Sequence, residues 1–224
     1  MKNKINNLLS PPIKILSILI FSTIITKLAA WLIDYKYSNF YPQANSIVKF
    51  SDLFSPAQDG GYFEHFQLIL ILWCVILSSI WIIKKKYYIL FVIPSIYSFL
   101  LFDDFLLIHD RVDRYLSLKI SFFINYSFLS EYFYWFIVFI IVTIFSFPPF
   151  IKGNYEIRNF LKVNFIFFIL LSFFALFIDS IKSTYISFPI KMGLMIIEEC
   201  GEIIVISCAF IWLFSKNLIH KYKK

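Results

Sequence analysis

Six long apolar runs divide this chain and constrain its fold more than any other feature. They cover residues 13–33, 62–83, 87–109, 131–147, 163–180 and 190–214. Several reach about 20 residues, the length at which a helix crosses the hydrocarbon core of a bilayer. They are continuous, unlike the alternating segments of an outer-membrane barrel. We therefore predict an all-α, polytopic transmembrane helical bundle of six spans, forming one integral membrane domain over residues 1–224.

The charged residues predict how the spans are oriented. The chain is 60% hydrophobic and carries a net charge of +7. In a soluble protein this charge would suggest a nucleic-acid partner. Here most of the 21 Lys and Arg residues fall in the N-terminal segment, two loops and the C-terminal tail, as the positive-inside rule expects if both termini are cytoplasmic. We predict that orientation in the inner (plasma) membrane, with the lipid bilayer and not nucleic acid as the partner. The first run exceeds the apolar core of a signal peptide, so we expect a retained helix.

Three glutamates interrupt the last apolar run. Glu198, Glu199 and Glu202 fall within about 100° of arc on a helix, so they form one carboxylate face. A carboxylate in hydrocarbon costs about 2.5–3.5 kcal/mol even on the gentler insertion scales. The three must therefore face protein, water, protons or a cation. Gly193 and Gly201 lie on the neighbouring face, where small residues let another helix approach closely. We predict that this helix is buried among the others.

Other ionisable residues occupy the same depth of the predicted membrane. With both termini inside, they lie in or just within the outer leaflet, and Asp103 and Glu198 each lie roughly 10 Å below its surface by the helical rise. Because scattered charges are costly in lipid, we expect one shared cavity. Its candidate residues are Glu64, His65, Asp103, Asp104, His109, Asp179, Glu198, Glu199 and Glu202.

Simpler roles are open to several of these residues. Glu64 and His65 can cap the second helix at the interface, and Asp179 can pair with Lys182 at the headgroups. His109 begins a charged stretch that is typical of a solvated helix end. The Asp103-Asp104 pair and the three glutamates are the deepest and most numerous acids, so a role in capping or at the headgroups explains them least well.

Carboxylates with one or two imidazoles are typical ligands of zinc, manganese or iron. We therefore predict a divalent metal ion as the cofactor of the cavity. The Glu-x-x-His pattern of helical di-metal sites is incomplete here, because Glu199-x-x-Glu202 lacks the imidazole. Asp104 and His109 are five residues apart, about 140° round a helix. They can share a ligand only if the helix ends or bends between them.

Three function classes fit this pattern. The first is a metal-dependent membrane hydrolase or related lipid-modifying enzyme, in which the metal activates water. The second is a transporter or channel whose acids bind a cation or relay protons. The third is a non-catalytic subunit of a larger complex. The substrate would be a lipid or an ion, and an oligomer or partner subunit stays open.

No nucleophile, redox or phosphate-binding motif decides between these classes. The sequence contains no GxSxG, CxxC or P-loop. Its Glu198-Glu199 pair is similar to the paired glutamates of CAAX-type intramembrane proteases. Ile203 stands where that family has an arginine, so the resemblance carries no catalytic role to these residues.

Overall fold

The computed structural model describes residues 13–25, 29, 62–120, 128–178, 181 and 188–219. Every element in these ranges is helical. The N-terminal helix covers Ile13–Ile25. It is followed by α4 (Tyr62–Lys85), the 3-10 turn η1 (Tyr88–Phe91), α5 (Val92–Leu106), α6 (Ile108–Lys119), α8 (Phe128–Lys152), α9 (Tyr155–Ser172), the π-helical segment η2 (Phe173–Ile178) and α11 (Phe188–Ile219).

Four helical stretches in the described ranges are long and apolar enough to cross a membrane: Glu64–Lys85, Tyr88–Leu106, Leu129–Lys152 and Tyr155–Ile178. They correspond to the predicted second to fifth spans. The first prediction falls partly on the shorter helix Ile13–Ile25 and partly outside the described residues. The sixth falls in α11, a helix of 32 residues. The described part of the protein is thus all-helical with membrane-compatible helices, while six spans and cytoplasmic termini stay predictions.

The junction between α8 and α9 differs from the sequence expectation. The predicted fourth and fifth spans, 131–147 and 163–180, leave Pro148-Pro149 and the charged stretch 152–162 outside both helices. Instead α8 continues to Lys152, and the Gly153 N–H donates to the Pro149 carbonyl at 3.0 Å. The Asn154 side chain then accepts a hydrogen bond from the Ile157 N–H at 2.9 Å, so it caps α9 and starts that helix at Tyr155.

Gly153 is required at this junction because the two helices meet closely there. A Cβ atom at this position would lie 2.4 Å from both Ile157 and the Pro149 carbonyl oxygen. No larger residue fits without moving backbone. The two prolines lie inside α8, and each lacks the N–H that would donate to the carbonyl four residues earlier, so the helix continues past them at a cost in stability.

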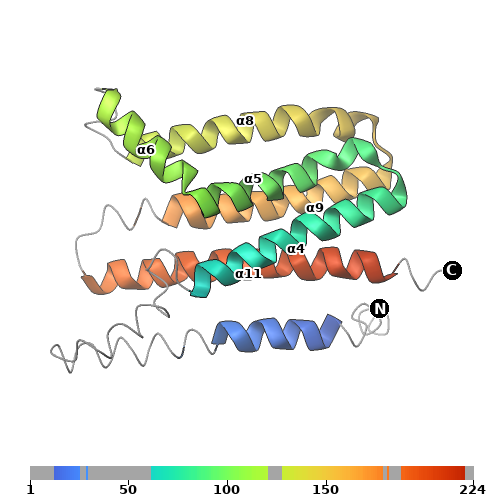
Figure 1. The fold of residues 1–224 in the computed structure, drawn as a ribbon, viewed down its shortest axis with the longest axis horizontal. Helices are drawn as coiled ribbons and strands as arrows, with labels where there is room; N and C mark the ends of the chain where they lie inside the picture. Colours follow the sequence, from blue (N-terminus) through green and yellow to red (C-terminus); the bar gives the residue numbers. More distant parts are fainter. Residues whose placement is uncertain are drawn as a thin grey trace.

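The long helices lie side by side (Figure 1). α4 packs against α5 and α11, while α9 packs against α8 and α11. Near one end, Trp81 of α4 stacks on Phe160 of α9 with ring centroids 4.0 Å apart, and Phe160 also contacts Trp212 of α11 at 5.2 Å. Large aromatic rings therefore join three helices in one core.

The last helix is built into this core, as predicted. Ile203, Ala209 and Leu213 of α11 are completely buried. The close approach that we expected occurs at Gly201, where an added Cβ would lie 2.2 Å from the ring of Phe174 in η2. It does not occur at Gly193, which has open space around it.

Charge is divided between the two ends of the bundle. The junctions α4–η1 and α8–α9 meet at one end, with the end of α11 beside them, and the junction α5–α6 lies at the other (Figure 1). A salt bridge of 2.8 Å from Lys85 to Glu156 joins the first two junctions. We call this the basic end, because it carries Lys84, Lys85, Lys86, Lys152, Arg158, Lys162 and Lys216. Most acids in the described ranges lie toward the opposite, acidic end.

Candidate metal centre

A break between α5 and α6 shapes the acidic end. Leu107 separates the two helices with φ 50° and ψ 48°, the left-handed conformation that costs an L-residue other than glycine roughly 1–2 kcal/mol. The predicted third helix, 87–109, is therefore not continuous. Six residues of an unbroken helix would separate Asp103 from His109 by about 9 Å along the axis. The break brings Asp103 and His109 together. It also supplies the bend without which Asp104 and His109 could not bind the same ligand.

Asp103 is the buried centre of the site. Its side chain is 0% exposed, and both carboxylate oxygens have partners. Oδ2 lies 2.9 Å from Nδ1 of His109, and Oδ1 accepts a hydrogen bond of 2.5 Å from the hydroxyl of Tyr134 on α8. These contacts join α5, α6 and α8. They also fix the orientation of the His109 ring, whose Nε2 atom lies 3.6 Å from Asp110.

Asp104 faces a second set of polar groups, on α4 and α11. The buried side chain of Gln67 donates a hydrogen bond of 3.0 Å from Nε2 to Oε2 of Glu202. The same amide interacts with Asp104, and Asp104 and Glu202 lie close enough to repel each other electrostatically. Gln67 therefore links the Asp-Asp pair of α5 to the glutamate face of α11.

Asp103, Asp104 and His109 form a group that could hold a metal ion. One ligand atom from each residue lies within 4.8 Å of the other two. Ligands about 2.1 Å from one tetrahedral ion lie about 3.4 Å from one another. The three ligand atoms would therefore have to move closer together, by up to roughly 1.4 Å, to bind one ion.

His109 is the one member of the group that lies outside the four candidate spans. Burial by itself lowers the pKa of His109, but the hydrogen bond and charge of Asp103, with the charges of Asp110 and Asp104, outweigh it and raise the pKa to about 9. The imidazole is thus held as a cation beside Asp103 near neutral pH, and a metal ion would replace its proton.

The remaining predicted residues differ in how they relate to this group. Glu64 is partly buried in the first turn of α4 and interacts electrostatically with Asp104, whereas the neighbouring His65 is exposed. Glu198 and Glu199 are partly buried on α11 and interact electrostatically with Glu202. Asp179 lies outside the described residues.

Two residues of the site, Gln67 and Tyr134, were not predicted from the sequence. Gln67 is an uncharged polar residue within an apolar run, which is itself a signal that it has a buried partner. Tyr134 lies in the aromatic-rich sequence Tyr132–Phe136, where nothing distinguishes it from residues that face lipid. Only its position opposite Asp103 shows its role.

Residues 18–216 match the family described as "Domain of unknown function (DUF8692)". The chain belongs to this family. The DUF8692 match covers most of the chain, including every residue of the metal-compatible group and its partners Tyr134, Gln67 and Glu202. No curated protein and no solved structure matches the chain.

Proposed function

We propose that this protein is an integral membrane protein that binds one divalent cation through Asp103, Asp104 and His109. The observation that carries the proposal is the convergence of these three side chains across the helix break at Leu107. Acids that share a buried site repel one another unless some are protonated or a cation lies between them. A divalent ion would offset that repulsion.

The donor atoms narrow the choice of ion. Two carboxylates and one imidazole suit zinc, manganese and iron, which accept both oxygen and nitrogen ligands. Three protein ligands also leave coordination positions for water or a substrate. Tyr134 would hold the Asp103 carboxylate in place as an outer partner of the metal, a kind of support that metal sites need for affinity.

As the reaction class we favour metal-dependent hydrolysis or a related lipid modification. A metal ion with an open position would activate water. Glu202, held by Gln67 opposite Asp104, is our candidate for the base that accepts its proton. Glu64, Glu198 and Glu199 would surround the site and raise the local concentration of cations.

Cation or proton transport is the second candidate, favoured by the Gln67 link. This link places carboxyl groups of α5 and α11 in one polar row, which is how transporters relay ions between helices. Vesicles containing the purified protein separate the two functions. Transport requires ion flux across the sealed vesicle, whereas hydrolysis requires a cleaved lipid and no flux.

Metal analysis of the purified protein tests the binding site. After loading with zinc, manganese or ferrous iron in turn, the wild type should retain one ion per chain, and Asp104→Asn and His109→Gln should retain none. Glu156→Gln is the matched control, because it removes an acid at the basic end. Retention of the ion by both site variants, or none in the wild type under every loading, contradicts the proposal.

A variant of Glu202 tests its role separately. Glu202→Gln should keep the ion but lose hydrolysis, since the metal ligands remain. Glu198→Gln should have the smaller effect on hydrolysis. Loss of the ion in Glu202→Gln would instead make Glu202 a ligand.

We also propose six spans with both termini cytoplasmic, in the inner (plasma) membrane. The cluster of Lys and Arg residues at the basic end supports this orientation. Reporter fusions after Lys86 and after Lys224 should both report the cytoplasm. A signal from the other side at either position would contradict the orientation.

A further inference from the structure

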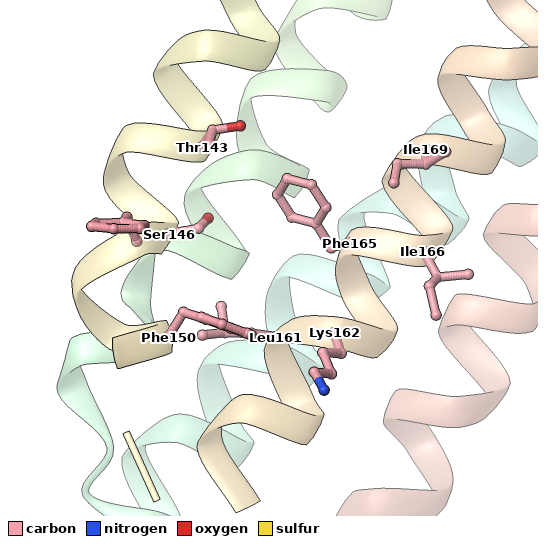
Figure 2. Close-up of a pocket in the computed structure, with 9 residues that line it drawn as sticks. Thr143, Ser146, Phe150, Leu161, Lys162, Phe165, Ile166 and Ile169 are labelled. Carbon is pink, nitrogen blue, oxygen red and sulfur yellow. The ribbon is translucent and has the colours of Figure 1, made fainter. Parts of the chain in front are cut away.

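A groove between α8 and α9 lies at the other end of the bundle from the metal-compatible group. It has a volume of about 380 Å³, within the range of cavities that hold small ligands. Side chains from the last turns of α8 and the middle of α9 line it (Figure 2). Six of the nine lining residues are apolar, and the exceptions are Thr143, Ser146 and Lys162. Both helices are among the four candidate spans, so the groove opens where lipid would lie.

The groove runs along the two helices, the direction in which an acyl chain lies in a bilayer. Leu161 and Lys162 line it nearest the start of α9, and Ile169 lies seven residues after Lys162, which is roughly 10 Å further along the helix. Thr143 and Phe150 cover a similar length of α8. Figure 2 shows Phe165 directed from α9 toward α8, across the space between them. The polar mouth is therefore at the basic end, and the apolar length extends toward the middle of the bundle.

Lys162 is a charge within an apolar span. It lies seven residues after the start of the stretch Tyr155–Ile178, where a lysine is costly unless its amino group reaches a polar partner. In the described ranges its recorded contact is with the Phe150 ring, with Nζ 6.0 Å from the centroid. Its charge would be balanced by an anionic group at the membrane surface.

Ser146 provides a second, independent observation. This residue is only 8% exposed, and its hydroxyl has no hydrogen-bond partner within the described part of the chain. Figure 2 shows the hydroxyl directed from α8 toward α9, into the groove. A buried hydroxyl without a partner carries a cost, which a polar atom of a bound molecule would remove.

We propose that this groove binds one acyl chain of an anionic phospholipid, with its phosphate on Lys162 and its glycerol-ester region within reach of Ser146. The charge of the basic end favours this occupant over a neutral lipid. The mouth lies at the basic end, which carries the seven basic residues named above, and Glu156, the acid at that end in the described ranges, is already paired with Lys85. The site is separate from the proposed metal centre and does not depend on it.

Photo-crosslinking tests this site in the full chain. The protein is placed in phosphatidylcholine vesicles that contain a trace of phosphatidylglycerol with a photoreactive group in its acyl chain. Labelled peptides should come from residues 143–150 and 161–169 in preference to the other lipid-facing helices. A photoreactive phosphatidylcholine, whose choline cancels the charge of its phosphate, should label them about five-fold less, the effect expected for one lysine beside a net anionic headgroup.

Three variants sharpen the test. Lys162→Gln should bring the two probes to nearly equal labelling, whereas the control Lys152→Gln, at the same end but outside the groove, should keep the difference. Ile166→Trp fills the groove and should reduce labelling by both probes. If Ile166→Trp does not fold, the comparison of Lys162→Gln with Lys152→Gln still tests whether the groove selects the anionic lipid. Metal content should be unchanged in Lys162→Gln.

Three results would overturn the proposal. One is labelling spread evenly over the lipid-facing helices, and another is equal labelling by both probes in the wild type. The third is a groove that neither probe labels, together with an Ile166→Trp variant that is a monomer where the wild type is an oligomer. A second copy of the chain would then be the occupant of the groove.

Discussion

Nδ1 of His109 lies 2.9 Å from Oδ2 of Asp103, although the two residues belong to different helices joined by a single left-handed residue. Because Asp103 is completely buried and also accepts the Tyr134 hydroxyl, this pair holds the ends of α5 and α6 against α8. The candidate metal centre therefore depends on the backbone at Leu107 as much as on its own side chains.

Removing the Tyr134 hydroxyl tests how far this support matters. Tyr134→Phe should lower metal affinity about 10- to 100-fold, because the Asp103 carboxylate loses the group that orients it. The free energy of unfolding should fall by about 1–3 kcal/mol, the cost of an unsatisfied buried group. Competition with a chelator measures the affinity. Tyr132→Phe is the control, since its hydroxyl bonds to the Leu176 carbonyl; equal losses in both variants would refute a specific role for Tyr134.

The metal-free protein should lose stability in alkaline solution. The pKa of His109 is raised from 6.5 to about 9 in the folded protein, so protonation stabilises the fold fully below about pH 6.5. This contribution, at most roughly 3 kcal/mol, disappears as the pH rises through 9. Thermal unfolding after chelation, followed from pH 6 to pH 10 (about the range of the two pKa values), measures it. His109→Gln should lack this dependence, and an unchanged pH profile in that variant would assign it to other groups.

Two glycines of α11 provide a matched pair. Gly201→Leu should lower the free energy of unfolding by about 1–3 kcal/mol or more, because even its Cβ would lie 2.2 Å from the Phe174 ring. Gly193→Leu, on the same helix with open space around it, should be tolerated. Thermal unfolding and the yield of folded protein compare the two. Equal tolerance would mean that α11 does not pack closely against η2.

The link between Gln67 and Glu202 should appear as an energetic coupling. Gln67→Leu alone leaves a buried glutamate without its donor and should destabilise the protein by about 1–3 kcal/mol. The double variant Gln67→Leu/Glu202→Leu should be more stable than the sum of the single changes implies, by about 0.5–3 kcal/mol. The free energy of unfolding is measured for the wild type, the two single variants and the double variant, which together form a double-mutant cycle. Strictly additive effects of the two changes would exclude the link.

The membrane-compatible helices and the importance of the acids within them could be predicted from the sequence, because both depend on the composition of a single segment. A run of about 20 apolar residues predicts a membrane-compatible helix wherever it occurs, and a carboxylate within it must find a partner. This reasoning selected Asp103, Asp104 and Glu202 before their neighbours were known. It also predicted the close packing at Gly201, since a small residue beside a polar face favours helix contact.

The remaining features depend on contacts between distant parts of the chain. Nothing local marks Leu107 as the left-handed residue that turns His109 back to Asp103, because leucine is a good helix former and adopts this conformation at a cost that tertiary packing must offset. Tyr134 and Gln67 acquire their roles only from the helices placed opposite them. Helical period and membrane preference are properties of a segment, whereas the partners of a buried carboxylate are properties of the packed bundle.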